Sequence, residues 1–501
     1  MGVSVFPPLA SDAGSAKNFF FGIFPKSYIY EFGNPRFLGL PFGKIFRVRR
    51  SPVRRRSLSL PREISITEKE KKMADNFDSY VPEMVATRRK FHARPELGWT
   101  EFETTATVIT RLRALGYQVL CGTQVVKPEA VLGRDEKLVA AAIERAKSAG
   151  VSDELLSEMG GYTGAVGILD TGRPGPTLAF RFDMDALPIQ ELQDPAVHLP
   201  AKEGFASTFK GVMHACGHDA HTAVGLGVAR WLMDHKDELV GKVKLIFQPS
   251  EEGTRGSSPM TAAGVMDDVD WFFGGHIGTE CHSHEVGVCH DVFLATVKFD
   301  VDFTGLESHA GAAPEKGRSA LLAAANAAVM LSAISRTSEG DTRISVGKLV
   351  AGTGRNITPA HAHMECEVRG TTSEACDFMW EKAQTVVKGA AEMLGVEVKL
   401  TKVGEATTLK ATPAAMEVVR KAAAAAKDVK EVKEITAPQA SEDCTIFTRA
   451  VVAHGGNAAF FLYGCEHHGH HRPDFDVQDT VNLEPGLEVF AGIAKEVLGR
   501  K

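Results

Sequence analysis

Apolar residues in most of the chain follow two spacings, which predict strands that alternate with helices. Short runs rich in β-branched and aromatic residues predict strands over residues 117–120, 165–171, 177–188, 242–250 and 458–464. Runs with apolar residues every three or four positions predict helices over residues 81–92, 100–116, 136–150, 223–235, 414–426 and 487–499. This alternation is typical of an α/β fold, so we expect a mainly parallel sheet layered with helices.

The spacing changes near residue 295. Residues 296–305 alternate strictly between apolar and polar; then come a helix (319–334), two strands (342–350 and 361–370), a helix that ends near residue 394 and a strand (396–400). This β-α-β-β-α-β order is that of a split βαβ unit. We therefore predict an α+β two-layer sandwich over residues 296–404, inserted into a larger domain that comprises residues 73–295 and 405–501.

Residues 1–72 differ in composition from the rest of the chain. Asp12 and Glu31 are the only acids before residue 63, and arginines crowd residues 47–62. Such a segment is typical of a transit peptide, which would imply import into an organelle. We favour a start of translation at Met73, and exclude residues 1–72 from the predicted fold.

The composition excludes several classes of protein. The 501 residues are 44% hydrophobic and 24% charged with a net charge of -6, so no strongly basic surface is available for nucleic acid. No run approaches the ~18 apolar residues of a membrane span. The 8 cysteines form no CxxC pair and follow no secretory leader, which favours a reducing, cytoplasmic location. Small molecules or other proteins are the expected partners.

Histidine and cysteine mark the first candidate site, in the segment MHACGHDAH at residues 213–221. Cys216 and His218 are both suitable ligands for Zn²⁺ and related ions, and a loop that enters a helix can direct two side chains to one point. Two other interpretations remain open at this stage. Cys216 could be a nucleophile activated by a histidine, or the segment could be a well-packed turn.

Acidic residues follow two of the predicted strands. Glu251 and Glu252 come directly after strand 242–250, at the edge where active sites of open α/β sheets lie. One of two such acids can bind metal while the other holds or removes a proton, although an isolated Glu-Glu pair is more often a polar turn. Asp183 and Asp185, in RFDMDALP, come at the carboxyl end of another predicted strand, and an acid there can fix the tautomer of a metal-bound histidine.

Two further candidate ligands follow apolar strands. His276 is a single histidine in FFGGHIG, and residues 466–475 contain four histidines. A lone histidine is more often structural, but cysteine, glutamate and three histidines from four strand ends make a complete ligand set. We interpret a further group as part of a solvated loop: Cys281, His282, His284, Cys289 and His290.

With these residues assembled, the chain resembles the aminoacylase/carboxypeptidase family of binuclear metallopeptidases, in its amidohydrolase branch. The resemblance covers residues 80–499 and includes MHACGHDAHT, the Glu251–Glu252 pair and the inserted sandwich. It implies a zinc-peptidase-like catalytic domain with a lid and dimerisation domain. It also implies two divalent ions, Mn²⁺ or Zn²⁺, held by ligands at these positions: Cys216, His218, Glu252, His276 and His471.

The resemblance assigns roles to five other residues. Glu251 matches the general base, and Asp185 matches the acid that supports a ligand. His309 matches a histidine that reaches the active site of a dimer partner, and Asn356 and Arg369 match residues that bind the substrate carboxylate. His471 is preferred to its neighbour because it lies four residues before Phe475. Gln478 departs from the family, which usually has an acid nearby.

The implied activity is hydrolysis of an N-acyl amino acid, with p-aminobenzoyl-glutamate as the favoured substrate. Indole-acetyl and benzoyl conjugates are alternative substrates. The expected assembly is a homodimer, or a heterodimer with a related B subunit. The remaining alternative is a non-catalytic subunit that supports an active paralogue. The presence of Glu251 argues against it, because a purely structural metal site needs no free base.

Overall fold

The structure is a computed structural model that describes residues 77–437 and 440–500. The interpretations of residues 1–72 and of Met73 lie outside this range. Among the helices of the described residues, none combines the length and the hydropathy that a membrane span requires.

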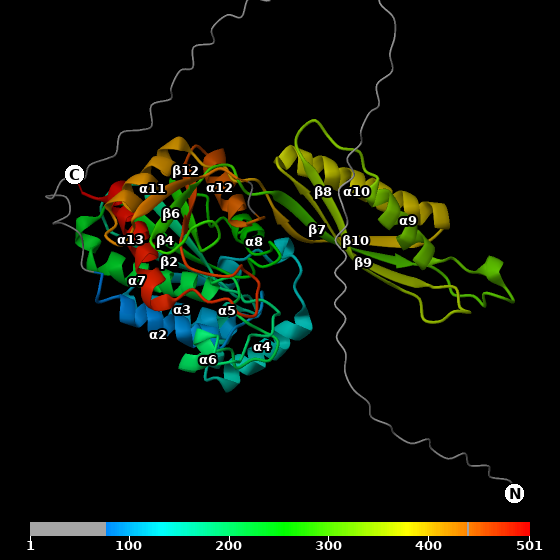
Figure 1. Cartoon of the computed structure of the whole chain (residues 1–501), viewed down its shortest axis with the longest axis horizontal. Coiled ribbons are helices and arrows are strands. Elements are labelled where there is room, and N and C mark those ends of the chain that lie inside the picture. The colour runs from blue at the N-terminus through cyan, green and yellow to red at the C-terminus, as the bar shows by residue number, and fades with distance from the viewer. Residues whose placement is uncertain (1–76, 438–439, 501) are drawn as a thin grey trace, which may run out of the picture. The chain divides into compact units, whose positions relative to one another are not determined.

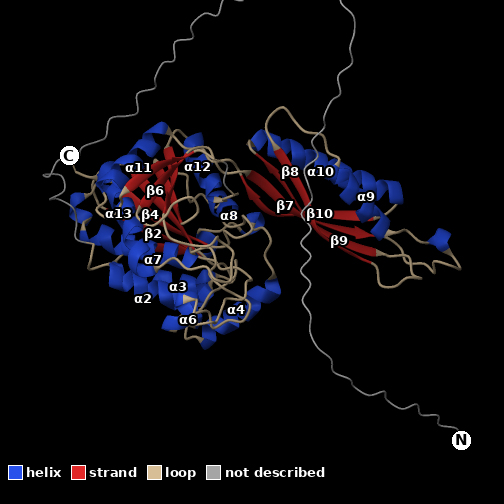
Figure 2. Cartoon of the chain, in the orientation of Figure 1, coloured by secondary structure: helices blue, strands red, loops and turns tan. Residues whose placement is uncertain are grey.

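An eight-stranded sheet with strand order β1-β2-β4-β3-β5-β12-β6-β11 lies at the centre of the larger domain (Figures 1 and 2). Its strands are β1 (Gln118–Cys121), β2 (Ala165–Asp170), β3 (Thr177–Asp183), β4 (Lys242–Gln248), β5 (Trp271–Ile277), β6 (Glu285–Cys289), β11 (Glu431–Ile435) and β12 (Asn457–Tyr463). The pairs β3–β4, β3–β5, β5–β12 and β6–β11 are parallel. The pairs β1–β2, β2–β4 and β6–β12 are antiparallel, so the sheet is mixed with a parallel centre.

Helices cover both faces of this sheet (Figure 2). They are α2 (Val81–Ala93), α3 (Phe102–Leu115), α4 (Glu136–Ser148), α5 (Asp153–Met159), α6 (Leu199–Glu203), α7 (His218–Asp234), α8 (Ser257–Ala262), α11 (Pro413–Ala425), α12 (Cys444–Ala453) and α13 (Asp479–Leu498). Successive side chains of a strand point to opposite faces. Phe272 contacts Phe447 of α12, whereas Phe273 contacts Phe180, which contacts Phe490 of α13. Helices α12 and α13 therefore lie on opposite faces.

The predicted sandwich is present as a second sheet with its own core. Its antiparallel strands follow the order β10-β7-β9-β8: β7 (Ala295–Thr304), β8 (Thr342–Ala351), β9 (His361–Gly370) and β10 (Glu397–Ala406). Helices α9 (Ala320–Ser332) and α10 (Ser373–Leu394) pack against one face, where Phe299, Val301 and Phe303 are buried. The other face carries the alternate polar residues of β7.

The interpretation of residues 281–290 as a solvated loop is wrong for the two cysteines and for residues 285–289. Residues 285–289 form β6, which lies between β12 and β11, and Cys281 and Cys289 are both buried. The short apolar run around Val286 and Val288 is sufficient for an inner strand once its neighbours cover it. The sequence pattern also missed β11, because this strand has the charged composition of an edge strand.

Candidate metal centre and active site

The parallel centre of the large sheet brings the candidate residues to one edge. Strands β3, β4 and β5 are neighbours, so the chain segments that leave their carboxyl ends carry Asp185, Glu251 and Glu252 to the same edge as His276 of β5. Cys216 and His218 stand at the start of α7, directly before and after Gly217. Gly217 has φ 93°, a left-handed conformation that suits glycine and turns the chain into the helix.

Six of the predicted residues line one cavity of about 460 Å³: Cys216, Glu251, Glu252, His276, Arg369 and His471. His218 lies beneath the surface, and its ligand atom is within 4.8 Å of those of Cys216 and Glu252. Cys216 Sγ is 3.4 Å from His276 Nε2. The structure thus brings four predicted ligands from three separate chain segments into one buried cluster.

Hydrogen bonds direct a free nitrogen of each histidine towards this cluster. His276 Nδ1 donates to the backbone oxygen of Ile277 at 2.8 Å, which leaves Nε2 facing Cys216. His218 Nδ1 donates to Asp185 at 3.2 Å, and its Nε2 is buried without a hydrogen bond. A neutral imidazole that donates through one nitrogen offers the lone pair of the other to a metal.

Asp185 lies where the resemblance places a supporting acid. Its carboxylate accepts hydrogen bonds from His218 and from the backbone N–H groups of Glu251 (3.0 Å) and Glu252 (2.9 Å). One buried side chain thereby fixes the tautomer of a candidate ligand and the backbone position of both glutamates.

The donor set fits divalent metal ions. Burial raises the pKa of Cys216 well above its ordinary value, so this thiol stays protonated unless a cation is close to it. Burial also lowers the pKa of His276 well below its ordinary value, which keeps the ring in the neutral form that binds metal. Sulfur, imidazole nitrogen and carboxylate oxygen together suit Zn²⁺, and imidazole and carboxylate also suit Mn²⁺.

Glu251 has the environment of a general base that depends on nearby cations. The residue is 8% exposed and lines the cavity. Burial and then the negative charges of Glu442 and Glu252 raise the pKa of Glu251 well above its ordinary value. Cations beside it would lower this pKa towards neutrality, the range in which a carboxylate exchanges protons efficiently.

Two adjacent histidines compete for the last ligand position. His470 Nδ1 is 3.5 Å from Cys216 Sγ, but His470 Nε2 accepts the backbone N–H of Thr279 at 3.1 Å. A neutral ring whose Nε2 accepts must carry its proton on Nδ1, so His470 directs a donor rather than a lone pair at the sulfur. His471 is half-exposed, and its Nε2 is 3.4 Å from Glu252 Oε1.

The sequence pattern did not identify several residues of the site. His221 lies one turn after His218, but Nδ1 donates to Asp183 and Nε2 accepts the N–H of Ile277, so neither nitrogen is free for a metal. Glu442 lines the cavity and is held by the buried Arg181 at 2.9 Å. The Glu442–Asp443 pair just before a helix was the available signal, and it lies far from the motif in sequence.

His309 and Asn356 are not part of this cavity. Both are exposed on the small sheet, where His309 bridges to Ile357 and Ala310 N donates to the backbone oxygen of Asn356. His309 Nδ1 accepts the N–H groups of Gly311 and Ala312, both at 3.1 Å, so Nε2 carries the proton. His309 therefore presents a fixed hydrogen-bond donor to solvent.

Buried ion pairs support the loops that carry the ligands. Arg88 of α2 contacts Asp219, next to His218, and also Asp476 and Asp479 of the C-terminal segment. His92, one turn after Arg88, contacts Asp219 as well. The start of α7 and the segment after His471 are thus tied to one guanidinium.

The chain is similar to hydrolases of known activity. Residues 179–496 match the peptidase family M20/M25/M40. The chain is 46% identical over 405 residues to an indole-3-acetyl-aspartic acid hydrolase of Enterobacter agglomerans, covering 80% of this chain and 93% of the relative. It is 44% identical over 421 residues to the A subunit of the p-aminobenzoyl-glutamate hydrolase of Escherichia coli, covering 83% of this chain and 96% of the relative.

Solved structures agree with these similarities. The aminobenzoyl-glutamate utilization protein of Klebsiella pneumoniae has a TM-score of 0.72 at 40% identity, over 84% of this chain and 97% of that chain. A dinuclear metal binding peptidase from the M20 family of Bacillus subtilis has a TM-score of 0.58 at 25% identity, over 84% of this chain and 99% of that chain.

Proposed function

Because the chain belongs to the M20/M25/M40 family of peptidases, we propose that it is a metal-dependent amidohydrolase of N-acyl amino acids, with p-aminobenzoyl-glutamate as its favoured substrate. The observation that carries this proposal is the cluster of Cys216, His218, Glu252 and His276 beside Glu251, a buried carboxyl group that lines the same cavity. The similarity to one chain of an aminobenzoyl-glutamate hydrolase supports the choice of substrate.

The ligands that would hold two divalent ions are Cys216, His218, Glu252, His276 and His471. Bound ions would supply a water of lowered pKa and polarise the amide carbonyl. Glu251 accepts a proton from the attacking water as the new C–O bond forms. It then returns this proton to the leaving nitrogen as the amide C–N bond breaks, so the products are a carboxylic acid and a free amino acid.

Arg369 and His309 would complete the reaction. Arg369 lines the cavity and offers two N–H groups in one plane, which match a substrate carboxylate. His309 Nε2–H would stabilise the negative charge that develops on the amide oxygen. Because His309 and Asn356 are exposed and lie outside the cavity of their own chain, we propose that both act in the site of a partner chain.

The edge of the small sheet is suited to that partner. Strand β8 is an edge strand, and the helix α9 that packs beside it is rich in alanine. These two elements expose several large apolar side chains: Leu322, Val329, Met330, Leu349 and Val350. The proposed partner is a second copy of this chain or a related B subunit, and exposed apolar side chains of this kind are typical of such an interface.

The proposed location is the cytoplasm. All eight cysteines lie in the described part of the chain and are buried and free. Thiols in this state are typical of a reducing compartment.

Metal analysis of the purified full chain, coupled to an assay on p-aminobenzoyl-glutamate, tests the proposed function. We expect about two divalent ions per chain, loss of activity with EDTA, and recovery with Mn²⁺ or Zn²⁺. Activity that EDTA does not affect would favour a cysteine amidase that uses Cys216. Absence of activity in the purified chain, with recovery only after addition of a B subunit, would favour a supporting role.

A second candidate substrate has its own support. The 46% identity to an indole-3-acetyl-aspartic acid hydrolase favours an indole-acetyl conjugate. Comparison of kcat/KM for p-aminobenzoyl-glutamate and indole-3-acetyl-aspartate decides between them, and a larger value for the indole compound would replace the favoured substrate.

A further inference from the structure

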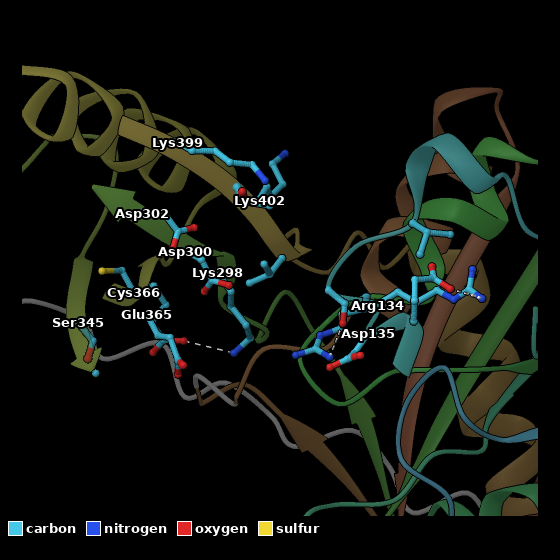
Figure 3. Close-up of a pocket in the computed structure, with 18 of the residues that line it drawn as sticks. Arg134, Asp135, Lys298, Asp300, Asp302, Ser345, Glu365, Cys366, Lys399 and Lys402 are labelled. Carbon is cyan, nitrogen blue, oxygen red and sulfur yellow. Dashed lines mark hydrogen bonds and ion pairs between the residues drawn. The ribbon is translucent and has the colours of Figure 1, made fainter. Parts of the chain in front are cut away.

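The cavity that Cys216, Glu252 and His276 line is called the metal cavity from here on. Lys298 lies where this cavity meets a second, larger one. It lines both of them. The second cavity has a volume of about 950 Å³ and lies against the open face of the small sheet, where β7 carries Lys298, Asp300 and Asp302 (Figure 3). The proposed mechanism has no role for Lys298.

Positive charge in the metal cavity is confined to one place. Among its described lining residues, Lys298 and Arg369 are the only lysine and arginine. The other ionisable side chains are histidines, Cys216 and four acids, the acids being Glu251, Glu252, Glu280 and Glu442. Apart from the metal ions themselves, only the end of the cavity with Lys298 and Arg369 attracts a substrate carboxylate.

A single carboxylate holds both cations. Glu367 lies opposite Lys298 in the pairing of β7 with β9, and its Oε2 is 3.3 Å from Lys298 Nζ. Arg369 Nε and Nη2 donate to Glu367 at 3.0 and 3.1 Å. Burial raises the pKa of Glu367, but hydrogen bonds from Arg369 and the charge of Lys298 lower it by more. The net effect is a lowered pKa, so the carboxylate is ionised.

Glu367 neutralises only one of the two cations, and several N–H donors of Lys298 and Arg369 do not contact it. The trio of Lys298, Arg369 and Glu367 has a net charge of +1. An ammonium has three N–H donors and a guanidinium has five, so contact with Glu367 leaves two donors on Lys298 and three on Arg369. The side chains of Lys298 and Arg369 are each 27% exposed, so water only partly compensates this charge.

From this geometry we propose that Lys298 binds the side-chain carboxylate of an acidic amino acid, so that the site selects amides of glutamate or aspartate. The inference rests on the proposed function and specifies its substrate class. Arg369 binds the α-carboxylate, which every N-acyl amino acid has, and Lys298 meets the second carboxylate, which only an acidic residue has. Glu367 is the positioning residue, since it contacts both cations on the two inner strands of the small sheet.

A purely structural role does not require Lys298. The two hydrogen bonds between Arg369 and Glu367 already form a complete bidentate pair on one strand. A second, partly buried cation beside that pair adds a desolvation cost and a charge that Glu367 does not compensate. Binding of a second anion removes this charge, which is the arrangement expected of a specificity site.

The test compares p-aminobenzoyl-glutamate with p-aminobenzoyl-glutamine, which has the same shape but a neutral side chain. The full chain, loaded with Mn²⁺ or Zn²⁺, should prefer the glutamate compound in kcat/KM. In Lys298→Met we expect this preference to fall about tenfold to a hundredfold, mainly through the KM for the glutamate compound, because a charge-assisted hydrogen bond is lost. Lys298→Arg should restore most of the preference.

Lys399→Met is the matched control. Lys399 lies on β10 and lines the second cavity but not the metal cavity, so its removal should leave the preference unchanged. A wild-type chain that cleaves both compounds equally well, or a Lys298→Met variant that keeps the wild-type preference, overturns this inference and leaves the proposed function intact. A metal-loaded chain that cleaves neither compound overturns both.

Discussion

Cys216, His218 and His276 are buried in a domain whose core is dense with aromatic side chains, whereas His309 and Asn356 lie in exposed loops of the small sheet. The core of the larger domain contains Phe180, Phe182, Phe247, Phe272 and Phe273 among many others. The core of the small sheet consists largely of alanines from α9 and α10 packed against β7 and β9, and α9 also exposes large apolar residues.

This difference separates two ways of positioning functional groups. The larger domain fixes its candidate ligands by burial, by hydrogen bonds such as that from His218 to Asp185, and by ion pairs beneath them. The small sheet fixes the tautomer of His309 but leaves the side chain in solvent. One region brings its candidate ligands together within the chain, and the other exposes the groups that we propose to act in a partner chain.

The largest expected effect comes from the assembled site. Glu251→Gln keeps the size of the side chain but removes the base, so kcat should fall by about 10²-fold to 10⁴-fold. Metal content should remain at the wild-type level, because Glu251 is not a predicted ligand. Turnover of p-aminobenzoyl-glutamate and metal content of the same preparation check both statements, and an active variant would remove Glu251 from its proposed role.

The second prediction concerns the buried ion pairs of Arg88, which lie beneath the candidate ligands. Arg88→Met leaves three buried or nearly buried acids, Asp219, Asp476 and Asp479, without their shared cation. We expect a loss of about 3 to 5 kcal/mol in the free energy of unfolding, the usual cost of breaking a buried ion pair. The midpoint of urea unfolding, followed by circular dichroism, measures this loss.

Arg420→Met is the control for this variant. Arg420 pairs with Glu434 at 2.7 Å, but the two side chains are 31% and 45% exposed. An exposed pair of this kind contributes at most about 1 kcal/mol. Equal shifts of the midpoint in the two variants would show that the network beneath the ligands has no special importance for stability.

The buried network also marks the limit of prediction from sequence. Strands β3, β4 and β5 and the residues that follow them were predictable, because apolar runs end at polar residues that must meet at one sheet edge. The network was not, because Arg88 and its partner Asp476 lie almost four hundred positions apart, and apolar periodicity does not identify charged residues as buried. Strand β11 was missed because three of its five residues are charged, which leaves too weak an apolar pattern.

The proposed action of His309 in a partner chain can be tested by mixing two inactive variants. His309→Ala should lower kcat by about 10²-fold to 10³-fold, the usual effect of removing one donor to a developing oxyanion. Its stability and metal content should not change, because the side chain is exposed. If His309 acts across a dimer of identical chains, a mixture with Glu251→Gln contains sites with an intact Glu251 and an intact partner histidine.

Random exchange of chains should restore about a quarter of the wild-type activity, because half of the dimers are mixed and each has one complete site. Mixing Glu251→Gln with itself under the same exchange conditions is the control. A mixture with no gain in activity, in which exchange is verified by differently tagged chains, would show that His309 acts within its own chain or towards a different protein.

The smallest expected effect concerns the choice between His470 and His471. Sequence spacing favours His471, and the structure places both rings near the cluster. Hydrogen bonding distinguishes them, because His470 Nε2 already accepts the N–H of Thr279 and its Nδ1 must then carry a proton.

We expect His471→Ala to lower metal affinity by about tenfold to a hundredfold, and His470→Ala to retain both ions. Metal analysis after dialysis at graded Zn²⁺ concentrations measures the two variants side by side. Loss of an ion from His470→Ala alone would transfer the ligand role to His470 and show that metal binding reverses the tautomer fixed by Thr279.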